Sequence, residues 1–91
     1  MVLRKEEMMN NKALDDVIKE GLRLLDKTNL TLGMVKVWVS YSMDIINIIS
    51  ANNYIKYQYS AKVNDALFGK ESPHNRLKEC LKFLIANYSS F

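Results

Sequence analysis

The sequence contains few of the residues that crosslink or interrupt a chain: one cysteine, one proline and three glycines in 91 residues. A single cysteine cannot form an intramolecular disulfide, which excludes a disulfide-stapled scaffold. The three glycines are far apart, so the chain has no glycine-rich loop that could cradle phosphate groups. Since no linker-like segment divides the chain, residues 10–91 are predicted to form one domain, preceded by a flexible N-terminal extension over 1–9.

Long apolar runs are also absent. The longest one has four residues, from Phe83 to Ala86, whereas a bilayer-spanning helix needs roughly 20. Acidic residues near the start of the chain occupy the place of the apolar region of a signal peptide. We therefore expect no membrane span and a cytoplasmic location.

Chemically reactive side chains are scarce and scattered. The one histidine, His74, excludes a site that needs two imidazoles, and is expected to be an exposed residue of a first helical turn. The one thiol, Cys80, is spaced with neighbouring leucines like a small core residue. Adjacent acidic residues occur only at 6–7 and 15–16, where a helix would splay them by about 100°. We therefore predict no enzyme, no catalytic residue, no metal, no cofactor and no small-molecule substrate.

The excess of positive charge is small and lies entirely in the second half of the chain. Residues 1–50 carry seven basic and seven acidic side chains, and residues 51–91 carry six and three, which accounts for the net charge of +3. A solvated, mildly basic surface is the simpler interpretation. The alternative is a small nucleic-acid-binding regulator that holds the phosphate backbone with Lys70, Arg76, Lys78 and Lys82.

Apolar residues recur at helical spacing in four segments, at about 11–27, 32–50, 54–68 and 73–88. Gly21 lies on the apolar stripe of the first segment, which predicts a close contact with another helix. The last segment opens with Ser72 and Pro73, an N-cap followed by proline at the first helical position. The pattern predicts an all-α fold, a small bundle of four helices.

The two middle segments also alternate apolar and polar residues, as strands do. An α+β fold with a hairpin at 34–43/54–63 therefore remains as the alternative. Helices are favoured because residues 44–53 are too apolar for a hairpin loop. In addition, Gly69 follows Phe68 as a glycine follows the last turn of a helix.

The second segment is unusually apolar for a helix of a small protein. Read as a helix, its polar residues form one narrow stripe, made up of Lys36, Ser40, Asp44 and Asn47. The rest of its circumference is almost entirely apolar. A helix of this kind is expected to be central and largely buried.

The chain carries more large apolar side chains than a bundle of about 80 ordered residues needs for its core. The residues predicted to form an interface are Trp38, Met34, Tyr41, Phe83 and Phe91. We predict a non-catalytic protein-interaction module that self-associates or binds another protein, and a well-filled monomer core is the simpler alternative. The mixture of Asn, Lys, Ile and Tyr resembles that of small helical proteins of phages and mobile elements, a likeness that implies no functional residue.

Overall fold

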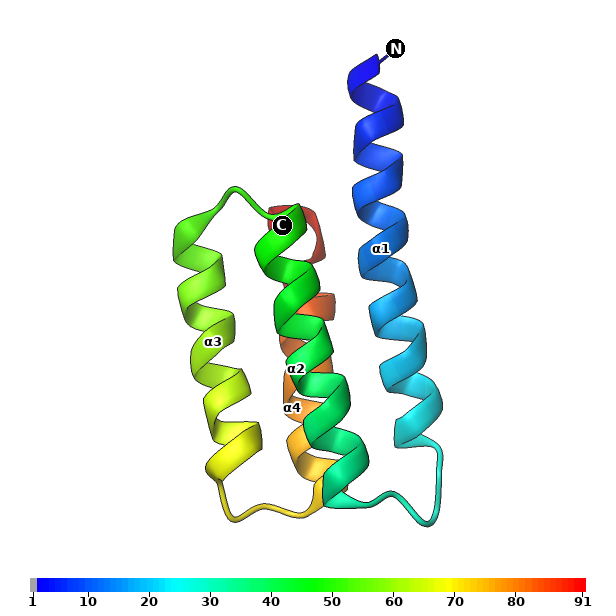
Figure 1. Cartoon of the computed structure of the whole chain (residues 1–91), viewed down its shortest axis with the longest axis vertical. Coiled ribbons are helices and arrows are strands. Elements are labelled where there is room, and N and C mark those ends of the chain that lie inside the picture. Colours follow the sequence, from blue (N-terminus) through cyan, green and yellow to red (C-terminus); the bar gives the residue numbers. More distant parts are fainter. Residues whose placement is uncertain (1) are drawn as a thin grey trace.

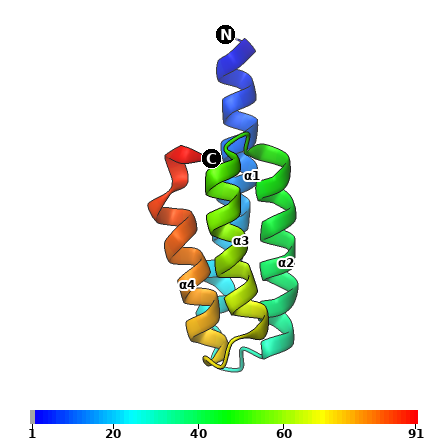
Figure 2. The ribbon, with the colours of Figure 1, turned by 90° about the vertical axis from the view of Figure 1, so that its left-hand side faces the viewer.

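The computed structural model describes residues 2–91, and the side chains from Lys12 onward. Figures 1 and 2 show four helices that run alternately down and up, joined by short connections. They are α1 (Val2–Leu25), α2 (Leu32–Ile49), α3 (Asn53–Phe68) and α4 (Pro73–Ala86), followed by the short 3-10 helix η1 (Tyr88–Ser90). The predicted all-α bundle is confirmed. The alternative hairpin at 34–43/54–63 is wrong, since both segments are helical.

Local sequence signals account for the helix starts. Thr31, Asn52 and Ser72 cap α2, α3 and α4, and each side-chain oxygen accepts a hydrogen bond of 3.2 Å from the backbone N–H three residues further on. Pro73 follows the last of these caps, as predicted. At the other end of α3, Gly69 has a φ of −74°, so it ends the helix without adopting a left-handed conformation.

The first helix is longer than the predicted 11–27 and begins at Val2. Because residues 2–20 contain neither glycine nor proline, nothing in them interrupts a helix. The N-terminal part of α1 projects past the ends of the other helices (Figures 1 and 2). The flexible extension expected over 1–9 stays a prediction, because Met1 and the side chains of 2–11 lie outside the described residues.

Each helix packs against its two neighbours in a closed ring, and α2 also touches α4 across the ring. Apolar side chains from all four helices form one core between them: Leu14, Val17, Leu24, Leu30, Val35, Trp38, Val39, Ile46, Tyr59, Val63, Ala66, Leu77, Cys80, Leu81 and Leu84. The C-terminal segment is attached to α1 through the Tyr88 hydroxyl, which donates to Asp15 Oδ1 at 2.6 Å.

The expectation that α2 is central and largely buried is wrong. Its buried residues are confined to one side: Val35, Trp38, Val39, Ser42 and Ile46. In a ring of four, every helix occupies a corner and turns only one side toward the core. Val37 and Ile48 lie on the outer side and are 73% and 78% exposed. The apolar surplus of α2 therefore faces outward.

The composition of α2 also bears on the expected absence of a membrane span. Among the helices of residues 2–91, α2 alone has the length and the apolar composition that crossing a membrane requires. Core helices of soluble proteins share this property, so it supports no argument about location.

Candidate functional site

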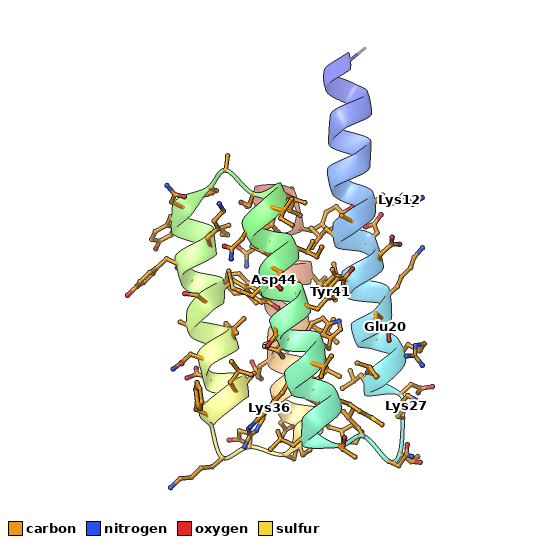
Figure 3. The ribbon with its side chains drawn as sticks, viewed as in Figure 1. Lys12, Glu20, Lys27, Lys36, Tyr41 and Asp44 are labelled. Carbon is orange, nitrogen blue, oxygen red and sulfur yellow. The ribbon has the colours of Figure 1, made fainter. Side chains whose placement is uncertain are left out.

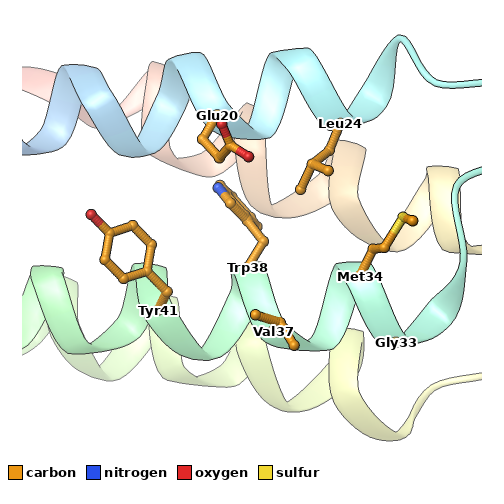
Figure 4. A pocket seen from close by; sticks show the side chains of 7 residues that line it. All are labelled: Glu20, Leu24, Gly33, Met34, Val37, Trp38 and Tyr41. Atoms are coloured by element: carbon orange, nitrogen blue, oxygen red, sulfur yellow. The ribbon is translucent and has the colours of Figure 1, made fainter.

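An apolar groove of about 400 Å³ lies between the C-terminal half of α1 and the N-terminal half of α2 (Figure 4). Seven residues line it: Glu20, Leu24, Gly33, Met34, Val37, Trp38 and Tyr41. Three of them, Met34, Trp38 and Tyr41, belong to the predicted interface, and the structure brings these three together.

The outer surface of α2 divides lengthwise into a polar and an apolar half. The predicted polar stripe, from Lys36 to Asn47, is exposed. Beside it runs an apolar row with the spacing of a heptad seam, made up of Met34, Val37, Tyr41 and Ile48. In Figure 3, Tyr41 lies between α2 and α1, whereas Asp44 lies on the front of α2. The part of this row from Met34 to Tyr41 borders α1 and forms one wall of the groove.

Trp38 forms the floor of the groove. Its side chain is only 3% exposed, and its indole Nε1–H donates a hydrogen bond of 3.0 Å to the backbone carbonyl of Val17 on α1. Gly21 makes room for the ring, because a Cβ at that position would lie 2.7 Å from Trp38 Cζ2 and 2.7 Å from Leu81 Cδ2. The close helix contact predicted at Gly21 is therefore confirmed, and it involves both α2 and α4.

Glu20 is the one charged residue in the lining of the groove. Its carboxylate accepts a hydrogen bond of 3.0 Å from Arg23 Nε, and the two side chains form an ion pair. This hydrogen bond lowers the pKa of Glu20 from its ordinary value, opposed by slight desolvation. The carboxylate therefore remains ionised and already partnered, and apart from the Tyr41 hydroxyl the rest of the groove offers apolar contacts.

The remaining residues of the predicted interface lie elsewhere. Phe83 stacks on Tyr59 with 5.6 Å between ring centroids, and Phe91 contacts Phe83 edge-on at 6.4 Å. Both phenylalanines are half-buried against the core. They fill space between α3, α4 and the C-terminal segment, and they take no part in the groove.

The residues predicted to bind nucleic acid are also separated by the fold. Arg76 donates through Nε to the carbonyl of Glu71 at 2.7 Å and through a terminal nitrogen to that of Ala66 at 3.1 Å. Its other terminal nitrogen donates to the carbonyl of Gly69. The guanidinium is thus engaged at the end of α3, whereas Lys70, Lys78 and Lys82 are exposed. Lys82 forms an ion pair with Glu79, with 3.8 Å between Nζ and Oε1.

A second, polar depression of about 270 Å³ surrounds Arg76. The lining residues come from the end of α3, the connection after it and α4: Lys62, Asp65, Ala66, Gly69, Glu71, Asn75, Arg76 and Glu79. Acidic side chains outnumber basic ones there. Such a lining does not favour a phosphate.

The structure corrects the expectation for His74. It is not an exposed first-turn residue but is half-buried, and its Nε2 lies 2.8 Å from the carbonyl of Lys27. As the donor in this contact, the imidazole links the start of α4 to the connection between α1 and α2.

Cys80 is a buried core residue, as expected. Its Sγ donates a hydrogen bond of 3.7 Å to the carbonyl of Lys62 on α3, and the thiol lies beside the Tyr59 hydroxyl, which pairs with Ser42. Ser42 Oγ donates to the carbonyl of Val39 at 2.6 Å, so the Tyr59 hydroxyl must donate to Ser42 Oγ, also at 2.6 Å. Burial raises the pKa of the Cys80 thiol to about 11 and raises that of Tyr59 as well. Both groups are neutral at physiological pH.

Two further findings complete the description of the site. Among the side chains of residues 12–91, no three histidine, cysteine, aspartate or glutamate residues are grouped so that they could hold a metal ion. No known family, curated protein or solved structure matches this chain.

The sequence pattern did not identify Glu20, Leu24 or Val37 as part of a site. Val37 carries a signal in retrospect, because it continues the heptad spacing of Met34 and Tyr41. Glu20 and Leu24 carry none, since they reach the groove only through the packing of α1 against α2.

Proposed function

We propose that this chain is a non-catalytic protein-interaction module whose α1–α2 groove receives apolar side chains from a helix of another protein, and which also self-associates. The observation that supports it is the groove, with its apolar walls and the Trp38 floor. Amphipathic helices dock into grooves of this kind through residues spaced three and four apart. The proposal includes a cytoplasmic location and an origin in a phage or mobile element, both of which rest on the sequence.

The lining favours a protein side chain over a small molecule. Small-molecule sites combine an apolar pocket with several convergent polar groups that fix the orientation of the ligand. Here the lining holds one charged side chain, Glu20, which is already bound to Arg23, and one hydroxyl group, that of Tyr41. An apolar row of a helix needs no such groups, because its own backbone polar groups are satisfied within the helix.

The proposal is tested with a library of helical peptides selected for binding to the wild-type chain. Val37→Glu places a carboxylate in the groove at a side chain that is 73% exposed, so it should leave the fold intact. Selected peptides are expected to bind this variant at least about tenfold more weakly, since an unpaired charge must be desolvated. Ile85→Glu on α4, outside the groove, is the matched control and should bind the peptides normally. Equal binding to all three proteins would refute the groove as the site.

The nucleic-acid alternative has a separate test in fluorescence anisotropy with mixed oligonucleotides. With Arg76 engaged by backbone carbonyls, Lys70, Lys78 and Lys82 are left of the four residues predicted to contact phosphates. Salt-sensitive binding that is lost in Lys78→Glu/Lys82→Glu would support this alternative.

A further inference from the structure

α3 has a second apolar face that no other part of the described chain covers. Its inner face is buried through Ile55, Tyr59, Val63 and Ala66. On the outer face, Tyr54, Tyr57 and Phe68 are 70%, 76% and 76% exposed, and Ala61 lies between them and is exposed as well. These four residues have the spacing of a heptad seam, and we call them the α3 seam.

We propose that the α3 seam binds a second copy of this chain, with the two α3 helices antiparallel and the two-fold axis beside Ala61. The inference rests on the proposed function, of which it specifies the self-associating part. It makes no use of the groove. Figure 2 looks onto α3, which no loop covers, and Figure 1 shows the projecting end of α1 at the opposite edge of the bundle.

The seam is complementary to itself in this orientation. Residues equally far before and after Ala61 lie level across an antiparallel pair, so Tyr54 meets Phe68 of the second copy, about 10 Å from the axis. By the same count, Tyr57 meets Asp65 of the second copy, and its phenol can donate to that carboxylate. At the axis, the small side chain of Ala61 allows the two helices to approach closely. Each contact away from the axis occurs twice, as an isologous interface requires.

Charge also favours the antiparallel orientation. The charged residues of α3 are Lys56, Lys62 and Asp65. In the antiparallel pair the two copies of Asp65 are about 12 Å apart along the axis and those of Lys56 about 15 Å, whereas those of Lys62, one position from the axis, are about 3 Å apart. A parallel pair would place the two Asp65 side chains at the same level, where they repel one another.

The area available predicts a reversible dimer. A buried aromatic side chain covers about 150–250 Å², so the three exposed rings offer about 400 Å² of each copy. With flanking side chains, the pair buries about 1,000–1,200 Å² in total, at the lower limit of specific interfaces. We expect dissociation in the micromolar range or weaker.

Sedimentation velocity over a concentration series tests the proposal. The wild-type chain should shift from monomer to dimer as its concentration rises. Tyr57→Glu should weaken the dimer at least about tenfold, because the new carboxylate faces Asp65 of the second copy. Adding Asp65→Lys to this variant should restore the dimer through two reciprocal ion pairs. Ile85→Glu, at an exposed residue of α4 outside both the groove and the α3 seam, is the matched control and should dimerise like the wild type. Val37→Glu should do the same if the groove takes no part in the dimer.

Disulfide trapping tests the register independently of affinity. Cys80 is buried, so a cysteine added at an exposed position is the accessible thiol. Ala61→Cys should form a disulfide-linked dimer under mild oxidation, because the two residues meet at the axis. Tyr54→Cys should not, because the two copies of residue 54 would be about 21 Å apart.

Several results would overturn the proposal: a monomeric mass at every concentration, a dimer indifferent to Tyr57→Glu, or trapping at residue 54 in place of residue 61. Loss of the dimer in Val37→Glu would assign self-association to the groove. Conversely, failure of peptide binding to the groove leaves the sedimentation result unaffected, so the two proposals fail separately.

Discussion

The contact between Gly21 and Trp38 shows how one absent side chain shapes the groove. Glycine inside a helix costs about 1 kcal/mol relative to alanine. Because Gly21 has no Cβ, the indole of Trp38 can lie directly against α1 and donate a hydrogen bond to the carbonyl of Val17. The groove floor therefore depends on a residue that contributes no surface of its own.

Gly21→Ala is expected to lower the free energy of unfolding by about 1 kcal/mol, despite the better helix propensity of alanine. The added Cβ would stand 2.7 Å from Trp38 Cζ2, and overpacking of this kind costs about 1–3 kcal/mol. Thermal unfolding measures the loss, as a fall in Tm of about 4–8 °C.

Gly33→Ala is the matched control, since the nearest atom to its new Cβ would be 3.9 Å away. This variant should gain up to about 1 kcal/mol from helix propensity alone. If Gly21→Ala were stabilised to the same extent, the close packing at Gly21 would be disproved.

Among the elements, the connection between α3 and α4 shows why a charged residue can serve structure instead of binding. The last carbonyls of a helix have no partners within it and form the negative end of its dipole. At the end of α3, Arg76 supplies both hydrogen-bond donors and a positive charge, through hydrogen bonds to the carbonyls of Ala66, Gly69 and Glu71. The arginine thus fixes the angle at which α4 returns along α3.

Arg76→Ala should lower the free energy of unfolding by about 1–2 kcal/mol, because hydrogen bonds from a charged group contribute about 1.5–3 kcal/mol and this one is partly exposed. Urea unfolding followed by circular dichroism measures the loss. Lys78→Ala, two positions later and exposed, should change stability by no more than about 0.5 kcal/mol. Similar losses in both variants would contradict a structural role for Arg76.

In the molecule as a whole, the polar cluster at the centre of the bundle joins three helices. Ser42 belongs to α2, Tyr59 to α3 and Cys80 to α4, and all three are fully buried. A buried polar network is stable only when every member has a partner, so it favours the one arrangement of helices that provides them. The cluster also connects the stability of the bundle to pH.

Stability should fall as the pH rises from about 9 to about 11. Burial raises the pKa of the Cys80 thiol from 9.0 to about 11 in the folded chain, so the folded state retains a proton that the unfolded state has lost. The stabilisation is complete below pH 9 and decreases by up to about 2–3 kcal/mol over this interval.

Urea unfolding at several pH values, followed by the fluorescence of the single tryptophan, measures this decrease. Cys80→Ala is expected to be less stable than the wild type at every pH. Its free energy of unfolding should nevertheless fall less than that of the wild type between pH 9 and 11. The raised pKa values of Tyr59 and Tyr88 affect both proteins, so the difference between their slopes isolates the thiol. Identical slopes would contradict the role assigned to Cys80.

The sequence alone determined the helices, because helix formation depends on residues within a few positions of one another. The caps at Thr31, Asn52 and Ser72 and the apolar spacing are signals of this local kind. The polar stripe of α2 and the need for close contact at Gly21 could be predicted for the same reason.

Only the tertiary structure decided which apolar surfaces are covered and which remain open. Trp38 and Val17 are 21 positions apart in the sequence, and Tyr88 and Asp15 are 73 positions apart, so no local sequence pattern predicts these contacts. The ring of four helices turned the apolar surplus of α2 outward and enclosed Phe83 against Tyr59. Burial depends on which helices become neighbours, and that choice is made by the packing of the whole chain.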